Sequence, residues 1–208
     1  MPYNTSPAII FLPGASGNTE FWQPIKQYFQ TLYRTHIISY PGFGGYAQQA
    51  DIRSMADLQQ HVLEQIQQPS IVVAQSMGGI FAMQAALQKP ELIHALILVA
   101  TSGGIDLSPF QVKDWRAQYQ QQFQVPDWFI EDHTHLDSRL PEVRCPVLLL
   151  WGDADPISPV AVGQYLQHQL AHAQLHIVPD GEHDLALVYA EQCQKLIQNF
   201  LQSLLPAD

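Results

Sequence analysis

Ser76 stands where an apolar run meets a second, glycine-containing apolar segment, in the stretch Ala74-Gln75-Ser76-Met77-Gly78. A serine hydroxyl becomes a nucleophile when a base removes its proton and an acid orients that base. A sharp strand-to-helix turn exposes such a hydroxyl, and small residues two places before and after it relieve backbone crowding. Ala74 and Gly78 supply these small residues, so the stretch predicts a nucleophile. The alternative is that Ser76 only caps the following helix.

An acid and a histidine follow later apolar runs of the chain. Asp153 and Asp155 come directly after the run 147–151, and His183 comes after the next run. Parallel strands deliver such groups to one edge of a sheet in the order serine, acid, histidine. The three positions therefore predict acyl transfer through a hydrogen-bonded triad.

The elements that must position these groups are short apolar runs separated by amphipathic segments. We predict strands at 8–12, 35–39, 70–75, 95–100, 146–151 and 174–178, and helices at 20–33, 55–67, 77–88, 159–170 and 184–204. Strands rich in Ile, Val and Leu that alternate with helices indicate a parallel sheet covered on both faces. The fold class is therefore α/β, a doubly wound, mostly parallel sheet of about six strands.

The interval 102–143 is too long for a structureless loop in a compact domain. We expect a short helical lid over the strand ends, inserted in a single domain that spans 1–208. Its aromatic residues predict an apolar substrate cavity, with packing of the lid onto the body as the alternative; they are Phe110, Trp115, Tyr119, Phe123, Trp128 and Phe129.

Composition excludes several classes of protein. Apolar residues make up 47% of the 208 residues and charged ones 13%, which excludes a disordered chain. Nine Lys and Arg against nineteen Asp and Glu give a formal net charge of −10, which argues against nucleic acid and anionic membranes as partners. Two cysteines and no evident signal peptide predict a cytoplasmic protein.

Taken together, these motifs resemble the α/β-hydrolase superfamily, in the branch of small serine esterases and C–C hydrolases. The resemblance runs from Ile9 to Leu201 and lacks the first two strands usual in that fold. The chain is similar to carrier-protein methyl-ester esterases and to menaquinone-pathway and meta-cleavage hydrolases. The sequence departs from the family at Gln75, where histidine often precedes the nucleophile, and at Glu182, where glycine is frequent.

The resemblance also implies roles for individual residues. Asp155 has the family's spacing within the acid loop, whereas Asp153 shapes the turn and Asp106 is a less favoured acid. His183 precedes the final helix, as the family's histidine does. The loop after the first strand resembles the family's oxyanion loop, which implies that the N–H groups of Ala15 and Met77 bind the oxyanion.

We therefore expect a serine hydrolase that cleaves small to medium carboxylic esters or thioesters through an acyl-enzyme. C–C bond cleavage by the same triad and a non-catalytic binding protein are the alternatives. Expected substrate contacts are Gly14, Trp22, Gln75, Trp115 and Trp128.

No cofactor or metal is expected, because the pair His133 and His135 lacks further ligands nearby in the sequence. The expected partner is a small-molecule ester, free or carrier-linked. Lys113 and Arg116 would contact an acidic carrier or a substrate carboxylate, or form a solvated pair.

Overall fold

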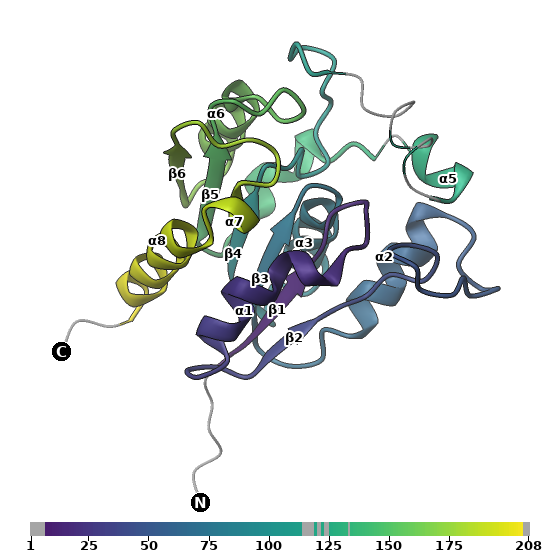
Figure 1. The fold of residues 1–208 in the computed structure, drawn as a ribbon, viewed down its shortest axis with the longest axis horizontal. Coiled ribbons are helices and arrows are strands. Elements are labelled where there is room, and N and C mark those ends of the chain that lie inside the picture. Colours follow the sequence, from purple (N-terminus) through teal and green to yellow (C-terminus); the bar gives the residue numbers. More distant parts are fainter. Residues whose placement is uncertain (1–6, 114–118, 120–121, 123–124, 133, 206–208) are drawn as a thin grey trace, which may run out of the picture.

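The apolar runs form one central sheet (Figure 1) in the computed structural model, which describes residues 7–113, 119, 122, 125–132 and 134–205. Its strands are β1 (Ala8–Leu12), β2 (Thr35–Ile37), β3 (Ser70–Gln75), β4 (Ile93–Val99), β5 (Val147–Gly152) and β6 (Ala173–Val178). All neighbouring strands are parallel, in the order β2-β1-β3-β4-β5-β6. The predicted fold class is confirmed.

The strand order creates one crevice at the carboxyl edge of the sheet. β1 lies between β2 and β3, so the chain moves to one side of β1 and then to the other. Loops that leave β1 and β3 therefore diverge, and ligands of open α/β sheets bind in the gap between them. Ser76 follows β3 directly and lies at this point.

Helices cover both faces of the sheet. The α-helices are α1 (Gln23–Phe29), α2 (Met55–Glu64), α3 (Met77–Gln88), α5 (Asp127–Ile130), α6 (Val160–Gln169), α7 (Leu185–Val188) and α8 (Ala190–Ser203). Two 3-10 helices, η1 (Thr19–Trp22) and η2 (Asp137–Glu142), complete the described elements. In Figure 1, α1 and α8 lie in front of the sheet and α3 lies behind it.

Alternation along the strands divides the core into two layers. In β1, Ile10 and Leu12 pack on the side of α2, α3 and α6, whereas Ile9 and Phe11 pack on the side of α1 and α8. Successive side chains of a strand point to opposite faces, so a strand buried on both faces must be apolar throughout.

Two predicted helices are divided in the structure. The predicted helix 184–204 is two helices, α7 and α8, because Tyr189 between them has φ −106° and ψ 39°. The predicted helix 20–33 is η1 followed by α1, which ends at Phe29. Within 102–143, the described elements are only the short helices α5 and η2.

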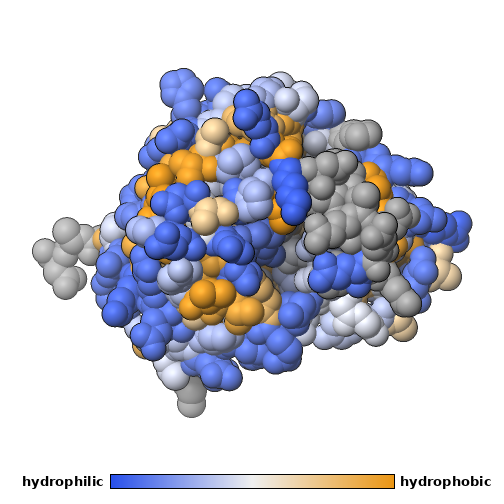
Figure 2. Space-filling model, turned by 45° about the horizontal axis from the view of Figure 1, so that its top comes forward, coloured by the Kyte–Doolittle hydropathy of each residue, from blue (hydrophilic) through white to orange (hydrophobic). Residues whose placement is uncertain are grey.

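Hydrophilic residues cover most of the face seen in Figure 2, where apolar residues form separate patches. No helix within the described residues has both the length and the apolar character that crossing a membrane requires.

Candidate active site

Ser76 occupies a strained turn between β3 and α3. Its backbone has φ 52° and ψ −121°, a conformation that side-chain-bearing residues rarely adopt and that costs about 1–3 kcal/mol. Its side chain makes no capping hydrogen bond to the helix. The structure therefore gives no support to the helix-capping alternative, and the strain is typical of a turn held for function.

The turn is possible because α3 begins very close to the end of β1. A Cβ atom on Gly78 would lie 2.6 Å from the carbonyl oxygens of both Leu12 and Pro13. Ala74, two residues before Ser76, is completely buried. Gly78 therefore permits the close approach of α3 to β1, and Ala74 occupies a fully packed position.

Asp155 is held in one orientation by the backbone of its own loop after β5. Its Oδ1 atom accepts hydrogen bonds from the N–H groups of Ile157 (2.8 Å) and Ser158 (3.1 Å). Its Oδ2 atom lies 2.8 Å from Nδ1 of His183. The Asp155 residue is only 4% exposed. A buried carboxylate bonded in this way orients the imidazole and stabilises its protonated form.

The loop that carries His183 packs against the loop that carries Asp155. The N–H of Ala154 donates to the carbonyl of Gly181 (3.0 Å), and the N–H of Asp180 donates to Oδ1 of Asp153 (2.7 Å). Asp153 thus links the two turns through this hydrogen bond, whereas Asp155 contacts His183. The alternative acid, Asp106, instead accepts hydrogen bonds from Ser108 at the protein surface.

Ser76 and His183 line one cavity of about 70 Å³, which we call the Ser76 pocket. Its other walls are mainly apolar and include Ala15, Met77, Ile80, Leu107, Tyr119, Phe129 and Ile157. An apolar enclosure strengthens electrostatic interactions with a reacting group and limits its hydration.

Two peptide units beside Ser76 are anchored through their carbonyl oxygens. The Gly14 carbonyl accepts from the N–H of Gly17 (2.9 Å), and the Ser76 carbonyl accepts from Oγ1 of Thr101 (2.6 Å) and the N–H of Gly79 (2.9 Å). A trans peptide unit directs its N–H away from its carbonyl. These bonds therefore fix the directions of the N–H groups of the following residues.

Those following residues are Ala15 and Met77, the predicted oxyanion donors, and both line the Ser76 pocket. Within the described part of the chain, neither N–H donates to a protein acceptor. The two groups have the properties expected of donors prepared for a ligand oxygen.

The predicted substrate contacts differ in whether they lie next to Ser76. Gly14 lies against the Ser76 turn, because a Cβ atom there would come within 3.2 Å of Cβ of Ser76. Trp22 is completely buried, and its indole N–H donates to the Leu12 carbonyl (3.0 Å). It therefore has no surface to offer a substrate and instead supports the end of β1.

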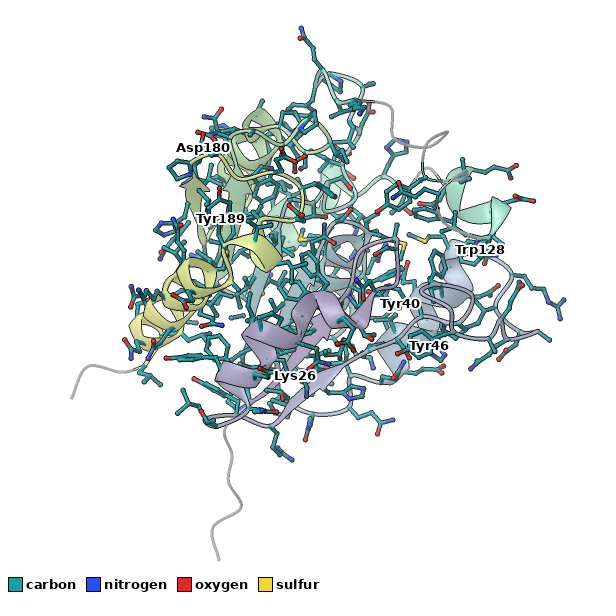
Figure 3. All side chains as sticks on the ribbon, in the orientation of Figure 1. Lys26, Tyr40, Tyr46, Trp128, Asp180 and Tyr189 are labelled. Atoms are coloured by element: carbon teal, nitrogen blue, oxygen red, sulfur yellow. The ribbon has the colours of Figure 1, made fainter. Side chains whose placement is uncertain are left out.

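Gln75 and Trp128 are not among the described residues that line the Ser76 pocket, and each contacts other protein groups. Gln75 is 6% exposed, and its Nε2 donates to the main-chain carbonyl of His183 (3.2 Å). Trp128, a residue of α5, packs edge-to-face on Phe43, with ring centroids 5.8 Å apart; Figure 3 shows it on the side of the molecule where Tyr40 and Tyr46 lie. Trp115 lies outside the described residues.

Sequence reasoning missed two buried side chains that hold the site together. Thr101, at the end of β4, bonds the Ser76 carbonyl, and Tyr40 donates its hydroxyl to the Pro13 carbonyl (2.9 Å). Burial raises the pKa of Tyr40 well above its usual value, so the hydroxyl stays protonated and remains a donor. A polar residue directly after a buried strand is the signal that could have identified Thr101.

The other predicted groups are placed as follows. Lys113 is exposed, and its N–H donates to the Pro156 carbonyl (2.9 Å), whereas Arg116 and His133 lie outside the described residues. Among the residues that the structure describes, no cluster of three His, Cys, Asp or Glu side chains is arranged to hold a metal ion.

Comparisons with known proteins agree with this architecture. A family model described as alpha/beta hydrolase fold matches residues 7–132, and one described as TAP-like protein matches residues 113–207. Human serine hydrolase BPHL is 24% identical over 236 residues, covering 94% of this chain and 79% of that protein. Pimeloyl-[acyl-carrier protein] methyl ester esterase from Citrobacter koseri is 33% identical over 94 residues, 45% of this chain and 36% of that protein.

Solved structures share the fold along nearly the whole chain. A putative lipase from Acinetobacter baumannii superposes with a TM-score of 0.83 at 20% identity, covering 97% of this chain and 85% of that one. An esterase from Thermogutta terrifontis gives 0.75 at 16% identity, with 96% and 91% covered. Because the alpha/beta hydrolase model matches more than half of the sequence and the sheet has the matching architecture, the chain belongs to the α/β-hydrolase family and is a hydrolase.

Proposed function

We propose that this protein is a serine esterase that cleaves carboxylic esters or thioesters through Ser76, His183 and Asp155. The observation that carries the proposal is the 2.8 Å contact between Asp155 and His183 in a cavity that Ser76 also lines. The strained backbone of Ser76 supports the same assignment.

In the first half-reaction, Oγ of Ser76 attacks the ester carbonyl carbon while Nε2 of His183 takes the hydroxyl proton. Asp155 accepts the Nδ1 hydrogen bond and stabilises the imidazolium. The carbonyl oxygen becomes an oxyanion that receives hydrogen bonds from the N–H groups of Ala15 and Met77. Collapse of this intermediate breaks the bond to the leaving alcohol, which receives the proton from His183 and departs.

The second half-reaction returns the enzyme to its starting state. Water attacks the acyl-Ser76 carbonyl, and His183 takes one of its protons. The second tetrahedral intermediate collapses, and Oγ of Ser76 leaves with the proton held by His183. The products are a carboxylic acid and the alcohol or thiol, so no oxidant or reductant is consumed.

The test is covalent labelling with a fluorophosphonate, followed by peptide mapping. We expect one adduct on Ser76 and none on Ser102 or Ser158, which also line the Ser76 pocket. Labelling should disappear in Ser76→Ala and fall by at least a hundredfold in rate in His183→Ala. Folding of each variant is checked by circular dichroism. An adduct on another serine, or equal labelling in folded His183→Ala, would refute the proposal.

Ester hydrolysis and C–C bond cleavage occur on the same fold, so a test with different substrates is needed to distinguish them. Para-nitrophenyl esters report ester hydrolysis, and vinylogous diketones report C–C bond cleavage by the same triad. We expect turnover of the esters alone. A folded protein that binds ester analogues without Ser76-dependent turnover would instead be the non-catalytic binding protein of the family.

A further inference from the structure

A second cavity of about 470 Å³ adjoins the Ser76 pocket, and we call it the outer chamber. The two cavities have four lining residues in common: Ile80, Ser102, Leu107 and Phe129. These four residues therefore border both spaces. The outer chamber is bordered by the segment after β4 and by the beginning of α2.

The sizes of the two cavities differ in a way that bears on the substrate. The Ser76 pocket, at about 70 Å³, is far smaller than the roughly 300–1,000 Å³ of a typical ligand-binding cavity. The outer chamber lies within the range of volumes typical of ligand-binding cavities. A substrate larger than a short ester must therefore extend beyond the Ser76 pocket.

The inner wall of the outer chamber is apolar. Met55, Ile105, Phe110 and Val112 line it without contributing to the Ser76 pocket. Met55 and Ile105 are 6% and 4% exposed, so they belong to the packed core and form a fixed surface. Such a wall binds methylene groups through the free energy of removing apolar area from water.

The position of His183 indicates which part of an ester the outer chamber receives. The leaving alcohol takes its proton from His183 and must lie beside it. His183, Ile157 and Ser158 line the Ser76 pocket but are not among the described residues of the outer chamber. Because none of the described residues that line the outer chamber comes from the loop of Asp155 or the loop of His183, we assign this chamber to the acyl chain and not to the leaving group.

The rim of the outer chamber is acidic. Asp106 accepts hydrogen bonds from the N–H (2.9 Å) and hydroxyl (2.7 Å) of Ser108, which lower the pKa of its carboxyl group. Asp132 accepts two from Thr134. Among the described lining residues of both cavities there is no lysine or arginine. Among the described residues that line the outer chamber, a carboxylate at the far end of an acyl chain would meet the two carboxylates Asp106 and Asp132 and one potential cation, His135.

We propose that the outer chamber binds the acyl chain of the ester and selects an uncharged apolar chain that is too long for the Ser76 pocket alone. This proposal rests on the proposed function, since it assigns the substrate class of the same site. It identifies Ile80, Leu107 and Phe129 as the side chains over which the acyl chain passes.

The first experiment varies acyl length in para-nitrophenyl esters from acetate to octanoate. Each pair of methylene groups placed on the apolar wall should raise kcat/KM by about tenfold. In Val112→Trp, whose indole would occupy the chamber, the octanoate-to-acetate ratio of kcat/KM should fall at least tenfold. The control is Leu32→Trp, at a site that is 60% exposed and outside both cavities, where the ratio should not change.

A second measurement does not depend on turnover. Calorimetric titration with 2-decanone, an uncharged ketone that is not hydrolysed, should detect binding that Val112→Trp weakens at least tenfold. If hydrolysis depends on Ser76 but neither the ratio nor ketone binding responds to Val112→Trp, the outer chamber is wrongly assigned and the proposed function stands. If Val112→Trp weakens ketone binding but Ser76 is not labelled, the proposed function fails, and the outer chamber is an apolar binding site that no longer serves an ester.

The proposed preference for an uncharged acyl chain is tested by comparing two methyl esters. Methyl octanoate and monomethyl suberate have acyl chains of equal length, and only the suberate ends in a carboxylate. We expect at least a fivefold preference for the octanoate, and a smaller preference in Asp106→Asn/Asp132→Asn. A preference for the suberate would overturn the assignment of an uncharged acyl chain.

Discussion

At the scale of single residues, Thr101 lies outside the proposed triad but is hydrogen-bonded to the turn that carries Ser76. It is 1% exposed, and its hydroxyl donates to the Ser76 carbonyl while accepting from the N–H of Gly103 (3.0 Å). The Ser76 carbonyl belongs to the same peptide unit as the Met77 N–H. Thr101 therefore acts as a positioning residue for a proposed oxyanion donor.

Thr101→Val removes this hydrogen bond with little change in volume. We expect kcat to fall about tenfold with KM nearly unchanged, because a hydrogen bond of about 1–2 kcal/mol then no longer supports the donor used in the transition state. Steady-state kinetics on a soluble ester measures both constants. Thr101→Ser keeps the hydroxyl and should recover most of the activity; failure to recover would assign Thr101 to packing alone.

We propose Gln75 as a second positioning residue, because its amide joins the Ser76 turn to the main chain of His183. Gln75→Leu keeps the bulk but loses the donor. The His183 loop should then sample more orientations, and fluorophosphonate labelling of Ser76 should slow about fivefold to tenfold. The matched control is Gln84→Leu, which alters another buried glutamine, on α3, whose side-chain oxygen accepts a hydrogen bond from Gln88 (3.1 Å). Equal slowing in both variants would count against the positioning role.

The site residues differ in how far the sequence could predict them. That Ser76, Asp155 and His183 lie at one edge of the sheet could be predicted, because each follows a parallel strand, Ser76 directly and the other two within five residues; their joint catalytic role stays a prediction. The roles of Trp22 and Gln75 were not, because each depends on a carbonyl partner distant in the sequence, the Leu12 and His183 carbonyls. An aromatic or amide side chain near a motif has no sequence signal that separates substrate contact from support.

At the scale of elements, the site depends on how closely α3 approaches β1. Gly78→Ala would place a methyl group against two backbone carbonyl oxygens, at the 2.6 Å separations noted for Leu12 and Pro13. Backbone cannot move aside as a flexible side chain can, so α3 must shift. We expect a loss of about 1–3 kcal/mol in the free energy of unfolding, together with loss of activity. Urea denaturation gives the first quantity.

Gly45→Ala is the control for this substitution. Gly45 has φ +82° and no atom within 4 Å of an added Cβ, so alanine there adds backbone strain without a clash. Activity should remain near that of the original protein. If Gly78→Ala were equally active, the close approach of α3 to β1 would not be required for the site.

The strands were easier to predict than the helices. Predicted and observed strands agree to within about two residues, because a strand buried on both faces must be apolar along its whole length. The division at Tyr189 was missed, because the apolar pattern continues across it while the backbone turns. Packing of α8 against α1, on a common face of the sheet, is a tertiary effect that helical periodicity does not contain.

At the scale of the whole molecule, one sheet separates two apolar cores, and each cysteine packs against one of them. Cys193 belongs to the core with α1 and α8, and Cys145 packs against the other core. Burial raises the pKa of Cys145 to about 11 and that of Cys193 to about 12, from an ordinary value of 9.0. Both thiols therefore stay protonated at neutral pH and are poor nucleophiles.

These shifts predict how stability changes at alkaline pH. The folded protein keeps the Cys193 proton up to a pKa of about 12, whereas the unfolded chain loses it near pH 9. Because the folded state binds more protons in that interval, its stability falls as pH rises above about 9, and this group has no such effect below it. Tyr40, also buried with a raised pKa, acts in the same direction at higher pH.

Cys193→Ala isolates the thiol contribution. The variant loses packing and should be less stable than the original protein at pH 8, but its stability should decline less steeply with pH. The difference between the two free energies of unfolding should shrink by about 2 kcal/mol between pH 8 and pH 10.5. The reason is that each pH unit over which only the unfolded chain has lost the Cys193 proton changes the free energy of unfolding by about 1.4 kcal/mol. Urea denaturation at intervals across this range provides the comparison. A difference that stays constant with pH would mean that Cys193 titrates alike in the folded and unfolded states, and that its burial does not hold the proton.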